Sequence, residues 1–170
     1  SHGAGIGITI DGLPSGFEIN MDEVLKEMAR RAPGKSRLST ARKEGDQPEI
    51  LSGFFEGKTT GTPLCAVIRN SDQHSKDYGK LKDLMRPGHA DYPGFIKYKG
   101  FNDYRGGGHF SGRITAPLVF AGAVCKQILE LKGIRIGAHV KSIGKVNDKS
   151  FFDVDLTNEL LDEIKVNELP

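Results

Sequence analysis

The sequence predicts an α+β fold built as a single domain over residues 1–170. LCAVIRN at 64–70 is an apolar run of the kind found in buried strands. ITAPLVFAGAVCKQILELKG at 114–133 has the length of a helix and is apolar nearly all round. Long polar, glycine-rich connections separate these elements, and 170 residues suit one domain with a core.

The N-terminal third of the chain predicts one strand and one helix. The opening SHGAGIGITIDG is typical of a turn that runs into a short strand and ends at Asp11-Gly12. In the helix that follows, Asn20 is expected as the N-cap, with Glu23 as its capping-box partner. Pro33-Gly34 stop this helix. The apolar positions that fall on one of its faces are Met21, Leu25 and Met28.

The segment 71–113 has little periodicity of either kind, so no strong element is expected there. It nevertheless holds seven of the thirteen aromatic residues of the chain, which argues against disorder. A long irregular segment inside a compact domain is typical of a functional loop.

The C-terminal part predicts a long helix, a strand and a second helix. Thr115 is the expected cap of the helix at 114–133, with Pro117 in its first turn and Gly133 at its end. Residues 134–143 alternate as a strand, and 156–166 resemble a surface helix.

Composition sets limits on the class of protein. A net charge of +2 is too small to indicate nucleic acid or a membrane surface by itself. Cys65 and Cys125 lie in apolar runs and are expected to be buried free thiols in a reducing compartment. We find neither a leader sequence nor an apolar run near 18 residues, so the sequence predicts neither a signal peptide nor a membrane span.

Two basic, glycine-containing segments suggest anion binding. In the segment 30–43, glycine, serine and threonine residues separate Arg31, Arg37 and Arg42, and arginine side chains match phosphate and carboxylate groups bidentately. A solvated basic loop and a nucleic-acid patch remain open for this segment alone. RGGGHFSGR at 105–113 would let backbone N–H groups approach a ligand, although a flexible hinge has the same composition. The segment matches neither the P-loop nor the Rossmann fingerprint.

Three of the five histidines adjoin glycine in irregular segments, where core packing is a poor explanation for them. They are His2, His89 and His109. Their spacing matches no common metal-binding pattern, so no metal site is expected. Acid–base chemistry near neutral pH suits histidine better. His74 and His139 are interpreted as surface residues.

Five segments stand out along the chain, namely SHGAGIGITIDGLPSG, RRAPGKSRLSTARKEGDQ, ILSGFFEGKTTGTP, RPGHADYPGFIKY and RGGGHFSGRITAPLVFAGA. In this order and spacing, they resemble the chorismate synthase family. The resemblance extends from Ser1 to about Gly144. It implies an α+β sandwich in which helices pack between antiparallel sheets.

The resemblance also implies a reaction and its partners. Members of the family are lyases of aromatic amino acid biosynthesis. They convert 5-enolpyruvylshikimate 3-phosphate to chorismate by anti-1,4-elimination of phosphate, the last step of the shikimate pathway. They require reduced FMN, and NADPH where a member reduces its own flavin. A cytoplasmic homotetramer is implied, with no nucleic-acid or membrane partner.

Site residues carry over from the family motifs by similarity. His2 is the expected proton donor to the leaving phosphate, and His89 is expected to stabilise or protonate the reduced flavin. The residues expected to bind the substrate are Arg31, Arg37, Arg86 and Arg113. The residues expected to contact the flavin are His109, Phe110 and Ser111.

The sequence also departs from the family pattern. The stretch His109–Thr115 retains Ser111 and Arg113 but lacks an arginine, a serine and a glutamate, which puts the flavin contacts at 109 and 110 in doubt. The chain is expected to be the N-terminal part of such a protein without its first strand, and to be inactive by itself. The alternatives are a catalytically incomplete relative and an anion- or RNA-binding module.

Overall fold

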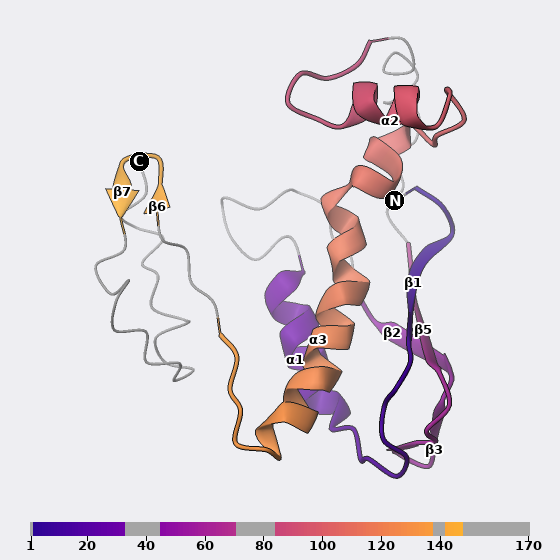
Figure 1. Ribbon diagram of the computed structural model, residues 1–170, viewed down its shortest axis with the longest axis vertical. Coiled ribbons are helices and arrows are strands. Elements are labelled where there is room, and N and C mark those ends of the chain that lie inside the picture. The colour runs from indigo at the N-terminus through magenta and orange to yellow at the C-terminus, as the bar shows by residue number, and fades with distance from the viewer. Residues whose placement is uncertain (1, 33–44, 71–83, 138–141, 148–170) are drawn as a thin grey trace. The chain divides into compact units, whose positions relative to one another are not determined.

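A computed structural model describes residues 2–32, 45–70, 84–137 and 142–147 (Figure 1). Its strands are β1 (Gly5–Ile10), β2 (Pro48–Ser52), β3 (Phe54–Phe55), β4 (Lys58–Thr59), β5 (Leu64–Arg69), β6 (Ser142–Ile143) and β7 (Val146–Asn147). Its α-helices are α1 (Met21–Arg31), α2 (Asp91–Lys97) and α3 (Thr115–Glu130), and two 3-10 segments, Arg105–Phe110 and Gly112–Ile114, precede α3. Mixed helices and antiparallel sheets confirm the α+β prediction.

The main sheet has three antiparallel strands in the order β1-β5-β2. Ile6 pairs with Ile68, and Pro48 pairs with the same residue from the other side. The predicted buried strand is therefore the central one. Its alternate residues, Leu64, Ala66 and Ile68, are all buried, so one face of the sheet is covered.

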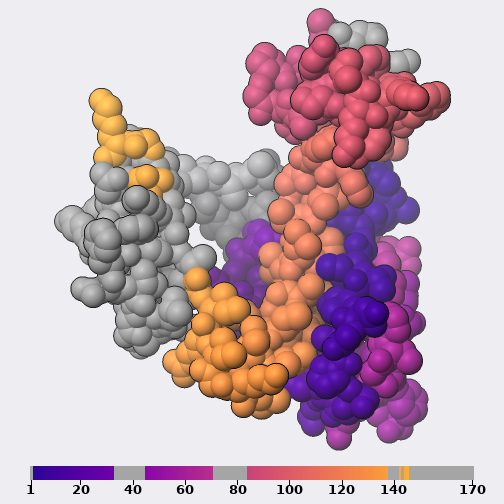
Figure 2. All heavy atoms as spheres, viewed as in Figure 1, coloured from indigo at the N-terminus to yellow at the C-terminus, as the bar shows by residue number. Residues whose placement is uncertain are grey.

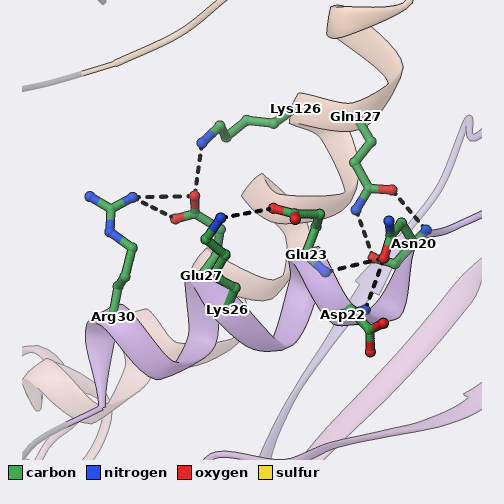
Figure 3. Close-up of polar contacts among 8 residues, drawn as sticks. All are labelled: Asn20, Asp22, Glu23, Lys26, Glu27, Arg30, Lys126 and Gln127. Carbon is green, nitrogen blue, oxygen red and sulfur yellow. Dashed lines mark hydrogen bonds and ion pairs between the residues drawn. The ribbon is translucent and has the colours of Figure 1, made fainter. Parts of the chain in front are cut away.

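The helix α1 begins at the predicted cap, but its partner was predicted wrongly. The Asn20 side chain accepts hydrogen bonds from the backbone N–H groups of Asp22 and Glu23, at 3.0 and 3.2 Å. The backbone N–H of Asn20 donates to Gln127 Oε1 at 2.9 Å, and Gln127 Nε2 donates to the Asn20 carbonyl at 3.1 Å (Figure 3). A residue from α3, distant in sequence, takes the place expected for Glu23.

A second polar contact joins the same two helices. Lys126 donates to Glu27 Oε1 at 2.9 Å, and Arg30 donates to both oxygens of the same carboxylate (Figure 3). Burial alone would raise the pKa of Glu27, but the hydrogen bonds and charges of Lys126 and Arg30 outweigh burial and lower it. α1 and α3 thus lie side by side, with Val24, Met28, Phe120 and Val124 buried.

The first turn of α3 differs from the prediction. Thr115 is the first residue of α3 and not its cap, and Ser111 caps the 3-10 segment Gly112–Ile114 before it, because its side chain accepts from the backbone N–H of Arg113 at 3.3 Å. Thr115 lies after the 3-10 segment and donates to the Gly112 carbonyl at 2.6 Å. The end at Gly133 is confirmed. The glycine has φ 69°, and the N–H of Ile134 returns to the Leu129 carbonyl.

The irregular segment contains a helix that the sequence did not predict. α2 is seven residues long, too short for periodicity to reveal. Asp91 lies in its first turn and Lys97 in its last, as the helix dipole favours. Gly94 is buried against Phe110, where a Cβ atom would lie 2.7 Å from the ring. Several apolar side chains of residues 84–110, red in Figure 2, are exposed, among them Tyr92, Ile96 and Phe101.

Contacts divide the chain into two compact units, 1–127 and 128–170. The single-domain interpretation of 1–170 stays a prediction. In the second unit, residues 134–137 are not a strand, so the strand expected at 134–143 is wrong over those four residues. Residues 138–141 lie outside the described residues, and Ser142–Ile143 is the strand β6, which forms a hairpin with β7. The expected helix at 156–166 lies outside the described residues. Both cysteines are free, but Cys125 is exposed and Cys65 half-buried, so the expected burial is wrong.

Candidate functional site

Two of the predicted substrate-binding arginines meet at one buried carboxylate. Arg31 donates through one terminal nitrogen to Asp46 Oδ2, and Arg113 donates through one terminal nitrogen to Asp46 Oδ1. The Asp46 side chain is fully buried, that of Arg113 is 4% exposed and that of Arg31 is 19% exposed. Two guanidinium groups against one carboxylate leave this cluster with one net positive charge.

Three separate elements bring this cluster together. Arg31 is the last residue of α1, Asp46 lies just before β2, and Arg113 lies just before α3. Arg113 Nε also donates to Asn70 Oδ1 at 3.1 Å, at the end of β5. Fixing charged side chains from distant segments in one place costs conformational entropy, so charge-assisted hydrogen bonds must outweigh that cost.

Asn70 links this cluster to the N-terminal strand and so to His2. Its side-chain nitrogen donates to the Gly3 carbonyl at 2.8 Å, and its backbone N–H donates to Ala4. His2 is buried, 6% exposed, although the sequence places it at the start of the chain. His2, the expected proton donor to the leaving phosphate, therefore directly precedes Gly3, whose carbonyl is bound by Asn70.

Arg86, His89 and Asp91 form a second cluster. Arg86 donates to both carboxylate oxygens of Asp91, at 2.8 and 2.9 Å, and its backbone N–H donates to the same group at 3.0 Å. His89 Nδ1 lies 2.7 Å from Asp91 Oδ1 and 3.2 Å from a terminal nitrogen of Arg86. We assign the Nδ1–H to Asp91, because that contact is the shorter one and is charge-assisted.

The Asp91 carboxylate is strongly stabilised in its ionised form. The hydrogen bond from the Arg86 side chain is the largest cause, and it outweighs burial in holding the pKa of Asp91 well below its usual range. The backbone N–H and charge of Arg86 and the nearby His89 act in the same direction. Arg86 therefore binds the carboxylate of Asp91, five residues further along the chain. The sequence predicted Arg86 as a substrate ligand but did not predict this contact.

The glycine run packs directly against this second cluster. Gly107 has φ 80°. A Cβ atom at this position would lie 3.3 Å from a terminal nitrogen of Arg86, 2.9 Å from His89 Nε2 and less than that from His89 Cε1. No residue with a side chain fits this backbone position and this space together. Two segments that the sequence singled out, 86–91 and 105–113, therefore form one unit.

A cleft of about 650 Å³ lies beside the glycine run. Its lining includes the backbones of Gly3, Gly5, Gly7 and Gly108 and the rings of Tyr98, Phe101, His109 and Phe110. This volume falls within the range of small-molecule sites. Glycine backbone and aromatic side chains suit a flat ring, which can stack on the rings and accept or donate hydrogen bonds at the glycines.

The structure separates the predicted site residues into groups. Arg31 and Arg113 share Asp46, whereas Arg86 and His89 share Asp91. His109 and Phe110 line the cleft, while Ser111 is not among its lining residues and caps the turn before α3. Arg37 lies outside the described residues.

Sequence reasoning missed Asp46 and Asn70. Asp46 belongs to an acidic pair of residues, with Glu44, after a basic segment, and a sequence pattern does not reveal that one of them is buried. Asn70 follows a confidently predicted strand, and a polar residue at the end of a buried strand is the one signal that points to it.

In the described part of the chain, no group of three or more histidine, cysteine, aspartate or glutamate side chains gathers in a way that could hold a metal ion. None of the helices in that part is long and apolar enough to cross a membrane.

The described elements define the class of α+β proteins with antiparallel sheets beside helices, here with a buried arginine–carboxylate cluster at Asp46, a half-buried one at Asp91 and a glycine-lined cleft. The family model described as chorismate synthase matches residues 1–168. The chain therefore belongs to the chorismate synthase family.

Curated relatives and a solved structure agree with this assignment. The chain is 51% identical over 149 residues to a chorismate synthase of Pyrococcus abyssi, covering 88% of this chain and 42% of the relative. It is 52% identical over 147 residues to one of Ralstonia nicotianae, covering 86% and 40%. A solved structure titled "Crystal Structure of Chorismate Synthase" matches with a TM-score of 0.63 and 33% identity, covering 91% of this chain and 38% of that one. The chain thus spans about two fifths of the length of these relatives.

Proposed function

We propose that the protein containing this chain is a lyase that converts 5-enolpyruvylshikimate 3-phosphate to chorismate with release of phosphate. The observation that carries the proposal is membership of the chorismate synthase family over residues 1–168. The proposal extends to reduced FMN as cofactor, to a homotetramer in the cytoplasm and to NADPH if the protein reduces its own flavin.

The charges of the substrate suit the arginine cluster. The substrate carries one phosphate and two carboxylates, and guanidinium forks bind such groups with charge-assisted hydrogen bonds. Arg31 and Arg113 already meet around Asp46 with one net positive charge, so an anion placed beside them is stabilised. This supports a substrate-binding role for the part of the site built on α1 and the start of α3.

The two histidines suit two different proton tasks. The elimination breaks the bond between carbon and the phosphate oxygen, removes one proton from the ring and forms a carbon–carbon double bond. We assign His2 to the phosphate, because a protonated imidazole beside the leaving group neutralises its developing charge. We assign His89 to the cofactor side, where Asp91 holds Nδ1 and Nε2 lies beside Gly107.

The cleft beside the glycine run suits the flavin ring. Its aromatic side chains can stack on an isoalloxazine, and the backbone of Gly3, Gly5 and Gly7 can approach its polar edge without steric interference. His109 and Phe110 would hold the ring there in place of the family's usual arginine and serine. Reduced FMN supplies electron density to the reaction without a net change in redox state.

Flavin binding tests this proposal. The protein that contains this chain, called the full chain below, is expected to bind oxidised FMN loosely when FMN is the only ligand. It is expected to bind FMN tightly when 5-enolpyruvylshikimate 3-phosphate is also present, with a perturbed flavin absorption spectrum. Absence of any spectral change with both ligands, together with RNA binding that weakens steeply with salt, would contradict the proposal and favour a nucleic-acid-binding module.

A further inference from the structure

We propose that Asp46 is a positioning residue that holds the Arg31 guanidinium for an anionic ligand, with Arg113 as its buried anchor. The inference rests on the proposed function, because the ligand is taken to be the phosphorylated substrate. It assigns different roles to the two arginines. Arg31 meets the ligand, and Arg113 acts through Asp46.

Exposure of the side chains supports this division. The Arg31 side chain is 19% exposed, whereas those of Arg113 and Asp46 are 4% and 0% exposed. A ligand that arrives from solvent therefore reaches the guanidinium of Arg31 first. Asp46 accepts a hydrogen bond from each arginine on a different carboxylate oxygen, so a movement of one guanidinium group shifts the carboxylate and disturbs the other.

The hydrogen bonds around Asp46 explain how a flexible side chain becomes fixed. Arginine loses about 2 kcal/mol of rotamer entropy when it is held in one conformation. Arg31 is held at two points, through Asp46 and through Thr115 Oγ1, which accepts from its Nε at 3.4 Å. Arg113 is held by Asp46, and also by Asn70. The entropy cost of ordering the Arg31 side chain therefore arises on folding and not on ligand binding, which raises the affinity for the ligand.

The backbone at Asp46 allows its charge and its shape to be varied separately. Asp46 has φ 44°, in the left-handed region that aspartate and asparagine tolerate better than most residues. Asp46→Asn therefore keeps the shape and removes the charge. Asp46→Glu keeps the charge and displaces the carboxylate by one methylene, and Glu56 at φ 48° shows that this chain accommodates glutamate in that conformation.

Substrate affinity of these two variants tests the inference. The dissociation constants of 5-enolpyruvylshikimate 3-phosphate and of inorganic phosphate are measured by titration calorimetry at fixed salt on the full chain, with the folded fraction checked by circular dichroism. The control is Glu56→Gln, which removes one exposed negative charge at a similar φ. Both Asp46 variants are expected to bind the substrate about 10- to 100-fold more weakly, the range expected for losing one charge-assisted hydrogen bond.

Other roles for Asp46 give different results. If Asp46 acted as a charge alone, Asp46→Asn would bind anions more tightly and Asp46→Glu would bind them as the unmodified protein does. If Asp46 served stability alone, both variants would lose thermal stability while their folded fraction kept full affinity. Either pattern overturns the inference, and Asp46→Glu decides it if Asp46→Asn does not fold.

A double substitution tests whether Asp46 acts through Arg31. In an Arg31→Lys background, Asp46→Asn is expected to cause little further loss of substrate affinity, because the fork that it positions is gone. Full additivity of the two losses would overturn the inference. Failure of the proposed function looks different, because the unmodified protein would then bind inorganic phosphate but not 5-enolpyruvylshikimate 3-phosphate.

Discussion

His89 Nδ1 lies 2.7 Å from Asp91 Oδ1, and Arg86 donates to both oxygens of the same carboxylate. The histidine is therefore oriented by a carboxylate that is itself held by an arginine. With Nδ1 engaged, Nε2 is the ring nitrogen beside Gly107 and the one available to exchange a proton with a bound group. This arrangement supports the acid–base role proposed for His89, with Asp91 and Arg86 holding its ring in place.

Replacing His89 should separate chemistry from binding. His89→Ala is expected to lower turnover by about 10²- to 10⁴-fold, the usual contribution of general acid–base catalysis. The dissociation constant of the substrate should change little, because the arginines around Asp46 remain. Steady-state turnover and equilibrium binding on the full chain measure the two effects, with Glu56→Gln as the control. Unchanged turnover would remove His89 from the mechanism.

Asp91→Asn should destabilise the fold in a pH-dependent way. The folded pKa of Asp91 lies below its unfolded value of about 3.9, so the ionised carboxylate stabilises the protein above that pH. This contribution is lost as the pH falls toward the depressed folded pKa. Urea denaturation should therefore show a deficit of about 1–3 kcal/mol for the variant at pH 5 to 7, which shrinks below about pH 4. A deficit that stays constant down to pH 2 would contradict the assignment.

Gly107→Ala should displace His89, and Gly57→Ala provides a matched control. The two glycines have φ 80° and 82°, so alanine costs similar backbone strain, about 1 kcal/mol, at either position. A Cβ atom at 107 collides with the His89 ring, whereas one at 57 meets nothing within 4 Å. Both variants should lose stability in thermal unfolding, and Gly107→Ala alone should lose most of its turnover. Equal turnover in the two variants would show that Gly107 does not position His89.

Gln127→Ala should cost more stability than Glu23→Ala. Gln127 makes two hydrogen bonds to the backbone of Asn20, and removing them should lower the free energy of unfolding by about 1–2 kcal/mol. Glu23 is exposed and does not make the capping-box bond to Asn20, so its replacement should cost a few tenths of a kcal/mol. Urea titrations of both variants give the comparison, and the reverse ranking would restore the capping-box interpretation.

The elements that sequence predicted best are those with strong local patterns. The strand at 64–69 is central and buried, and the helix from 115 carries the core residues Phe120 and Val124, as the apolar runs in both segments predicted. α2 was missed because seven residues give no periodic signal. Gln127 was missed as a cap because it lies 107 residues from Asn20, and no local pattern records a contact at that separation.

The candidate site was predicted in its parts and not in its connections. The arginines, the histidines and the glycine run all stand out from sequence, since their chemistry is unusual for irregular segments. Which carboxylate each arginine meets is decided by tertiary structure. Asp46, close in sequence to the basic segment, contacts both Arg31 and Arg113, and it lies 67 residues from Arg113 in the chain.

Turnover of the full chain tests the central claim most directly. With 5-enolpyruvylshikimate 3-phosphate and reduced FMN under anaerobic conditions, we expect chorismate and inorganic phosphate to form in equal amounts, while the segment 1–170 alone forms neither. Formation of no chorismate, under conditions in which the relative from Pyrococcus abyssi forms it, would contradict the account.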